Sequence, residues 1–142
     1  MAAGDFYFAI NATFRFIYER WGEGALIDYW RSLGREYYAD LSQRFRDGGL
    51  EEVERYWADY FAAEPDGNVT VSRIGDAVVI DVHRCPAMEW LKQANRRVMP
   101  LYCQHCLHVS SAIAEEANLV FELERGDCTC RQTFRSRERK VC

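Results

Sequence analysis

Apolar side chains recur every three or four positions along the first part of the chain, which is the spacing of one face of an α-helix. Three blocks carry this period: residues 6–20, 23–46 and 50–63. Trp21-Gly22 separates the first two blocks, and Asp47-Gly48-Gly49 separates the last two. Gly34 lies inside the second block, where glycine costs about 1 kcal/mol relative to alanine, so it predicts a kink or a close helix contact. The N-terminal part is therefore predicted to form three amphipathic helices.

The period shortens to two after a predicted turn at residues 64–68, which read Glu-Pro-Asp-Gly-Asn. Apolar and polar residues alternate over 69–73, and residues 77–82 are mostly apolar and β-branched. Gly75-Asp76 between them is typical of a tight reversal. This stretch is predicted to be a β-hairpin.

The remaining residues predict two helices and a second hairpin. The helices are expected over 87–95 and 101–117, each after a proline that can open a helix, and the strands over 119–124 and 128–134, around Gly126-Asp127. The whole order is three helices, a hairpin, two helices and a hairpin. It predicts an α+β fold, in which a helical N-terminal part precedes a four-stranded antiparallel sheet covered by helices on one face.

The length fits one domain over residues 1–142, because a chain of this size buries roughly two thirds of its unfolded surface. Within it we expect a helical subdomain over 1–65 and an α+β part over 66–135 that carries the cysteines and histidines. A short basic tail is expected over 136–142, as a solvated tail rather than a nucleic-acid-binding arm.

The composition limits the classes of function. A net charge of −4 argues against a nucleic-acid-binding protein. No apolar run approaches the ~20 residues of a membrane span, and the start lacks the basic segment and cleavage site of a signal peptide. We therefore expect a cytoplasmic protein that acts on a small-molecule substrate or ligand, without nucleic acid or membrane. The exposed faces of its aromatic-rich helices are compatible with a homodimer.

The reactive residues are concentrated in the C-terminal half. All three histidines and five of the six cysteines lie between Asp81 and Phe134. In a reducing cytosol, cysteines serve as metal ligands, nucleophiles or buried packing rather than as disulfides. If the two predicted hairpins pair in one sheet, Cys85 at the end of one strand, Cys130 in another and Cys103 at a helix start converge.

A metal site is one interpretation of these residues. Zinc takes four tetrahedral ligands from cysteine and histidine, and the Cys-x-x-Cys spacing of Cys103 and Cys106 suits one edge of that tetrahedron. Cys85 and Cys130 would complete the set. An iron–sulfur cluster needs the same thiolates, so zinc or such a cluster is the cofactor that this interpretation implies.

A nucleophilic thiol and simple burial are the alternatives. In the first, Cys85 or Cys103 attacks an electrophilic carbon, with His83 or His105 as base. His83 shares a strand face with Cys85, which makes it the better candidate. His105 lies about 100° from the helix face of the thiols, and His108 is expected to point away as well. In the second alternative, each cysteine is a small hydrophobic residue of the core.

Three motifs carry a resemblance to a known family: Cys85-Pro86, Tyr102-Cys103-Gln104-His105-Cys106 at a helix start, and Gly126-Asp127-Cys128-Thr129-Cys130 with a following Phe134. They resemble the L-2-amino-thiazoline-4-carboxylic acid hydrolase-like family. The motifs match over about the last 60 residues, and the rest of the chain matches only in outline. The closing strands are also similar to vinyl-reductase-type small-ligand-binding domains, some of which hold a zinc.

The resemblance implies a bacterial-type family of enzymes that open a thiazoline ring. Water or a thiol adds to the amidine-like carbon and the ring thiolate leaves, giving an N-carbamoyl-cysteine. The implied carriers are Cys85 and Cys103 as nucleophile or ligand, with Cys130 as support. Cys106 departs from the pattern, since the family tends to an acid there. We expect a hydrolase of a small cyclic amidine or thiazoline-type substrate; the alternative is a non-catalytic small-ligand sensor or binding protein with a Cys-rich zinc or iron–sulfur site.

Overall fold

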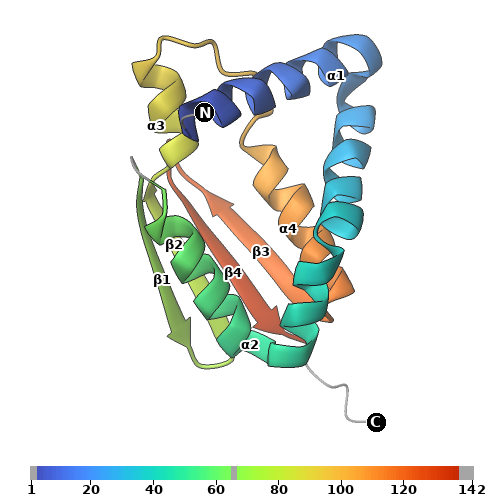
Figure 1. Ribbon diagram of the computed structural model, residues 1–142, viewed down its shortest axis with the longest axis vertical. Coiled ribbons are helices and arrows are strands. Elements are labelled where there is room, and N and C mark those ends of the chain that lie inside the picture. Colours follow the sequence, from blue (N-terminus) through green and yellow to red (C-terminus); the bar gives the residue numbers. More distant parts are fainter. Residues whose placement is uncertain (1–2, 65–66, 138–142) are drawn as a thin grey trace.

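The computed structural model describes residues 3–64 and 67–137 and has the α+β fold that the sequence predicts (Figure 1). In chain order its elements are α1 (Ala3–Ser32), the π-helical turn η1 (Leu33–Tyr37), α2 (Ala39–Ala62), β1 (Asn68–Ile74), β2 (Ala77–Arg84), α3 (Pro86–Gln93), α4 (Gln104–Glu116), β3 (Leu119–Arg125) and β4 (Cys130–Ser136). Within the described ranges, no helix combines the length and the apolar character needed to cross a membrane.

The two long helices are each bent at a glycine. Gly22 in α1 has a φ of 86° and Gly49 in α2 has a φ of 64°, in a region that only glycine occupies at little cost. These are the two positions where the sequence predicts helix ends. The three predicted helical blocks therefore exist, but they are joined by bends rather than by loops.

Gly34 lies in the π-helical turn that links α1 to α2, and it is buried. A Cβ atom placed on it would lie 2.6 Å from the carbonyl oxygen of Val109 and 2.5 Å from the Cβ of Ala112. The absence of a side chain thus lets the turn pack directly on the backbone of α4. This close approach confirms the contact that the glycine predicts.

The four strands form one antiparallel sheet in the order β1-β2-β4-β3. Each hairpin pairs its own two strands, and β2 pairs with β4 to join the hairpins. In this pairing Val82 lies opposite Cys130. The end of β2 and the beginning of β4 are therefore at the same end of the sheet, close to Cys85.

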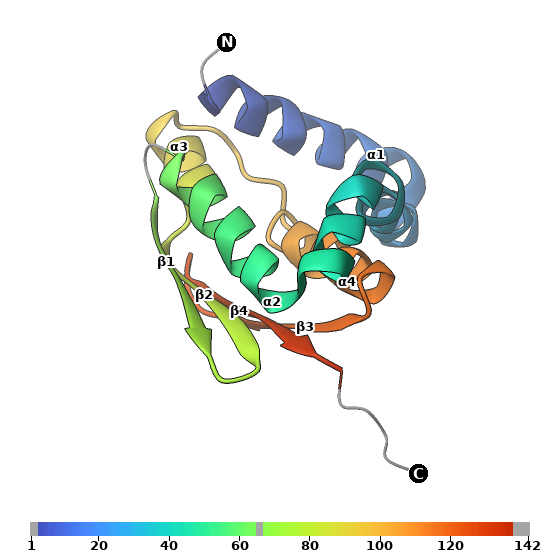
Figure 2. The same ribbon diagram turned by 60° about the horizontal axis from the view of Figure 1, so that its bottom comes forward.

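All the helices lie on one face of the sheet (Figure 2). The core on that face joins β2 and β4 to α2 and α4, and its members include Val78, Ile80, Phe134, Phe45, Val53 and Ile113. The opposite face carries polar side chains, with ion pairs of Asp81 to Arg131 at 2.7 Å and of Glu122 to Arg135 at 3.3 Å. One face of the sheet thus packs on the helices and the other carries these ion pairs, although the paired residues Val79 and Thr133 on that second face are also buried.

A second hydrophobic cluster fills the space between α1, α3 and the segment before α4. Its buried members are Phe14, Leu26, Trp30, Ala87, Leu91, Met99 and Tyr102. Asn11 ties α1 to this segment, since its side chain donates a hydrogen bond to the carbonyl of Arg97 and accepts one from the amide of Met99, both at 2.9 Å. This cluster holds α1 over the end of the sheet where the cysteines gather.

In the C-terminal half, two elements begin two or three residues later than predicted. The helix expected from Leu101 begins at Gln104, because the residues before it form consecutive turns. The strand expected from Cys128 begins at Cys130, because Cys128 has a φ of 55° and cannot be extended. Part of the predicted turn at 64–68 and most of the predicted tail, with Cys142, lie outside the described residues.

Candidate functional site

A cavity of about 210 Å³ lies between the helices and the end of the sheet where β2 ends and β4 begins. Its walls come from α1, α2, α3, α4, β2, β3 and β4, and they are mainly aromatic and aliphatic. This is where the two hydrophobic clusters meet, so the cavity lies between the two parts of the core. Ligand sites in proteins are typically apolar cavities with a few convergent polar groups, and this cavity has that character.

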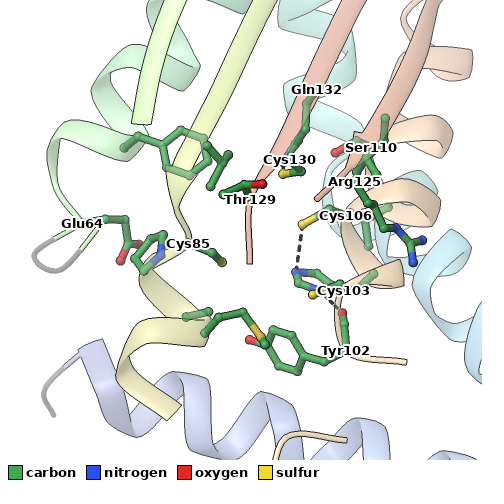
Figure 3. A pocket seen from close by; sticks show the side chains of 18 of the residues that line it. Glu64, Cys85, Tyr102, Cys103, Cys106, Ser110, Arg125, Thr129, Cys130 and Gln132 are labelled. Atoms are coloured by element: carbon green, nitrogen blue, oxygen red, sulfur yellow. Dashed lines mark hydrogen bonds between the residues drawn. The ribbon is translucent and has the colours of Figure 1, made fainter. Parts of the chain in front are cut away.

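Five cysteines line the cavity as free thiols: Cys85, Cys103, Cys106, Cys128 and Cys130. They come from the β2–α3 junction, the start of α4, the β3–β4 turn and β4. Figure 3 shows the sulfurs of Cys85 and Cys106 pointing toward the middle of the site from opposite sides. Pairing of β2 with β4 is what brings these segments together, so the predicted condition for convergence is confirmed.

Cys106 and His105 form a hydrogen-bonded pair on the cavity wall. The Sγ atom of Cys106 lies 3.4 Å from Nε2 of His105, and Nδ1 of the same ring lies 2.6 Å from the carbonyl oxygen of Tyr102 (Figure 3). A carbonyl can only accept, so Nδ1 carries the ring proton in the neutral imidazole. Nε2 is then an acceptor, and the Cys106 thiol donates to it.

Burial keeps both members of this pair uncharged at neutral pH. It raises the pKa of the Cys106 thiol to about 11, although Arg125 opposes the shift. Burial also lowers the pKa of His105 below its ordinary 6.5, against the hydrogen bond to Tyr102, which raises it. A neutral thiol beside a neutral imidazole is the arrangement of a nucleophile with its general base, and the Tyr102 carbonyl orients the base.

Cys85 lies at the N-terminus of α3, immediately before Pro86 in the first helical position. Burial raises the pKa of its thiol to about 12, although the backbone N–H groups of Met88 and Ala87 act in the opposite direction. The pKa values of Cys103 and Cys130 are raised too, mainly by burial. These thiols are therefore protonated at neutral pH.

Two charged side chains lie on opposite sides of the thiols (Figure 3). Glu64, just beyond the end of α2, accepts a hydrogen bond from the Tyr7 hydroxyl of α1, and both residues line the cavity. Arg125, the last residue of β3, lies on the other side and lowers the pKa of the Cys106 thiol. A carboxylate at one end and a guanidinium near the other give the site a polar axis.

His83 is not brought to this cavity. It is exposed on β2, with Nε2 3.3 Å from the hydroxyl of Thr70. The prediction that it shares a face with Cys85 is wrong, because the β1–β2 register shifts between the Asn68–Arg84 and Val69–Val82 pairs, and β2 ends at Arg84, so that Cys85 is the N-cap of α3. Strand alternation therefore does not extend from one residue to the other.

His105, the alternative base that the helical spacing disfavours, lies on the cavity wall in contact with Cys106. Helical spacing predicts that His105 points away from Cys106. Both residues lie in the first turn of α4, however, and there the His105 ring reaches the carbonyl of Tyr102. The ring turns back to that carbonyl and presents its other nitrogen to the thiol. His108, in contrast, stacks on Trp30 with 5.7 Å between ring centres and is absent from the cavity wall, in accord with its prediction.

The predicted metal ligands Cys85, Cys103, Cys106 and Cys130 all line the cavity. In the described part of the chain, however, no three or more histidine, cysteine or acidic side chains are arranged as a metal-binding group. The thiols thus share a cavity without forming a coordination shell in this structure.

The buried thiols predict an alkaline loss of stability. The unfolded chain releases the Cys85 proton near pH 9.0, whereas the folded protein holds it to about pH 12. Stability is therefore fully present below pH 9 and is lost as the pH rises toward 12, by roughly 2–3 kcal/mol at pH 11 for this thiol alone. Urea unfolding of wild-type protein and Cys85→Ala at pH 8 and pH 11 measures this loss. The variant lacks the Cys85 thiol but retains every tyrosine, so its free energy of unfolding should fall less between the two pH values than that of the wild type. Equal falls in the two proteins would contradict the assignment of this loss to Cys85.

The chain was compared with models of protein families, with curated proteins and with solved structures, and none of them matches.

Proposed function

We propose that this protein is a thiol-dependent hydrolase that opens a small cyclic amidine or thiazoline-type substrate, with Cys106 as nucleophile and His105 as general base. One observation carries the proposal. Inside the cavity, the Cys106 thiol lies 3.4 Å from Nε2 of His105, and Nδ1 of the same ring is hydrogen-bonded to the carbonyl oxygen of Tyr102. A nucleophile, a base and an orienting group in sequence are the usual components of covalent catalysis.

The reaction balances with water as the only co-substrate. The Cys106 sulfur attacks the ring carbon between nitrogen and sulfur while His105 takes the thiol proton. The ring carbon–sulfur bond breaks, and the imidazolium returns the proton to the departing sulfur, which leaves an isothiourea on Cys106. Water, deprotonated by His105, then adds to the same carbon. Expulsion of the Cys106 sulfur, which regains its proton, releases an N-carbamoyl-cysteine-type product.

The size and charges of the cavity support a small substrate with a cationic end. Sites for drug-sized ligands have volumes of roughly 300–1,000 Å³, so about 210 Å³ suits a single small ring. Glu64 is the carboxylate on the cavity wall and can pair with an amidinium group. The thiols of Cys85 and Cys103 have no histidine in hydrogen-bonding contact within the described residues, which is why Cys106 rather than these predicted nucleophiles is assigned the attack.

The proposal is tested by intact-mass spectrometry of the protein mixed with 2-amino-thiazoline-4-carboxylate. The expected result is a transient adduct with the mass of one whole substrate, located on Cys106 by peptide mapping, and a product heavier than the substrate by one water. Turnover without an adduct at this cysteine, or an adduct at Cys85 or Cys103, would contradict the assignment. Protein that carries stoichiometric zinc or iron, with its thiols protected until a chelator is added, would instead support the sensor or binding protein with a Cys-rich metal site.

A further inference from the structure

A second thiol contact lies at the edge of the cavity and has no part in the proposed ring opening. The Nζ atom of Lys92, near the end of α3, lies 2.8 Å from Sγ of Cys128 in the turn between β3 and β4. Cys128 also lines the cavity, while Lys92 is exposed. The pair joins two segments that are far apart in the sequence, with the amine on the solvent side of the sulfur.

The conformation of the turn brings Cys128 to Lys92. The amide of Gly126 donates to the carbonyl of Thr129 at 2.8 Å and closes the turn, and Cys128 within it has a φ of 55°. This left-handed backbone is uncommon for a residue with a side chain. The pKa of Lys92 is raised, chiefly by its hydrogen bond to Cys128.

We infer that Cys128 is a site of oxidation by hydroperoxides, in which Lys92 holds the sulfur and supplies a proton to the leaving oxygen. Peroxide cleavage needs a nucleophilic sulfur together with a proton donor for the hydroxide that departs. The Lys92 ammonium, in direct contact with the sulfur, is such a donor, because its protons are within reach of an oxygen that departs from this sulfur.

The step balances as a two-electron oxidation. The Cys128 sulfur attacks one oxygen of hydrogen peroxide and gives up its own proton to solvent, the sulfur–oxygen bond forms, and the oxygen–oxygen bond breaks. The departing hydroxide takes a proton from the Lys92 ammonium and leaves as water. Sulfur is oxidised to the sulfenic acid, peroxide is reduced, and the lysine recovers its proton from solvent.

The other thiols lack this combination. Cys85, Cys106 and Cys130 are partly buried, as Cys128 is, but among the described residues none of the three has a lysine or arginine nitrogen in hydrogen-bonding contact with its sulfur. Cys103 is exposed, but within the described residues no lysine or arginine nitrogen is in hydrogen-bonding contact with its sulfur. Cys103 is therefore a natural reference thiol, since it is open to solvent and belongs to the same cavity wall.

The test is the rate at which each cysteine is labelled by dimedone, which reacts with sulfenic acids, when the full-length protein is treated with hydrogen peroxide at neutral pH. Peptide mass spectrometry is expected to show Cys128 labelled faster than Cys103. Lys92→Met should slow labelling at Cys128 by at least about tenfold, because the proton donor is lost, and should leave Cys103 unchanged.

Arg96→Met serves as the matched control. Arg96 lies just beyond α3 and stacks on Phe8 at 4.8 Å, so this variant removes one positive charge without touching the Lys92–Cys128 pair. It should leave labelling at Cys128 at the wild-type rate. The inference is overturned if Cys103 is labelled as fast as Cys128, or if Lys92→Met has no effect at Cys128. It is overturned equally if both methionine variants slow Cys128 to the same extent.

Discussion

Alanine at position 106 is expected to lower kcat/KM for ring opening by roughly 10³-fold or more, the loss that follows removal of a nucleophile. Glutamine at position 105 should lower it by about 10²-fold, because the thiol then lacks a base. Alanine at position 103 is the matched control, since Cys103 lies one helical turn away on the same cavity wall. It should leave kcat/KM within a few-fold of wild type.

The pH dependence of the same reaction separates a base from a purely structural histidine. The mechanism needs His105 unprotonated, and burial lowers its pKa below 6.5. Activity should therefore decline on the acidic side with a midpoint below pH 6.5, as the imidazole gains its proton. Steady-state rates of wild-type protein from acidic pH to pH 8 measure the profile. An equal loss of kcat/KM in the Cys103 and Cys106 variants, or an acidic decline with its midpoint above pH 6.5, would refute these roles.

Replacement of Phe134 by alanine is expected to lower the free energy of unfolding by about 3–5 kcal/mol. Its side chain is 0% exposed and contacts aromatic rings from both layers of the fold. The ring centres of Phe45, Trp57 and Phe121 lie 6.1, 6.0 and 4.9 Å away. The substitution therefore removes buried apolar area and several ring contacts at once, and β4 cannot collapse onto the gap because it pairs with a strand on each side.

Urea unfolding provides the measurement, with Phe16→Ala as the matched control. Phe16 is 52% exposed on α1, so the same change of residue should cost less than about 1 kcal/mol there. A lower midpoint with an unchanged slope for Phe134→Ala would confirm a loss of stability without a change in the unfolded state. Similar midpoints for the two variants would show that Phe134 is not central to the core.

The fold was predictable because its signals are local. The helical period, the change to a period of two after residue 64 and the turn dipeptides each act over a few residues, and the structure follows them. Gly34 was also informative, since a glycine inside a helical pattern has few explanations and close contact is one of them. Local patterns decide which element forms and where a chain can bend.

The site was only partly predictable because it depends on distances between segments. Convergence of the cysteines followed from assuming that the hairpins pair, and β2–β4 pairing fulfils that condition. The side chain that contacts each thiol could not be predicted from the sequence. The choice of His83 assumed that the strand continues to Cys85, and His105 was set aside because a wheel projects backbone direction but not the rotation of a side chain toward a nearby carbonyl.

The strand order also has a consequence for how the molecule folds. Each hairpin can form from neighbouring residues, whereas the β2–β4 pairing joins positions about 50 residues apart, with α3 and α4 between them. Loop-closure entropy delays such long-range pairing relative to local structure. Cys85 follows β2, whereas Cys106 lies in α4 ahead of β3 and β4, so these two thiols come from opposite sides of the β2–β4 pairing. The burial that raises the pKa of these two thiols is therefore completed by the same step as the long-range pairing.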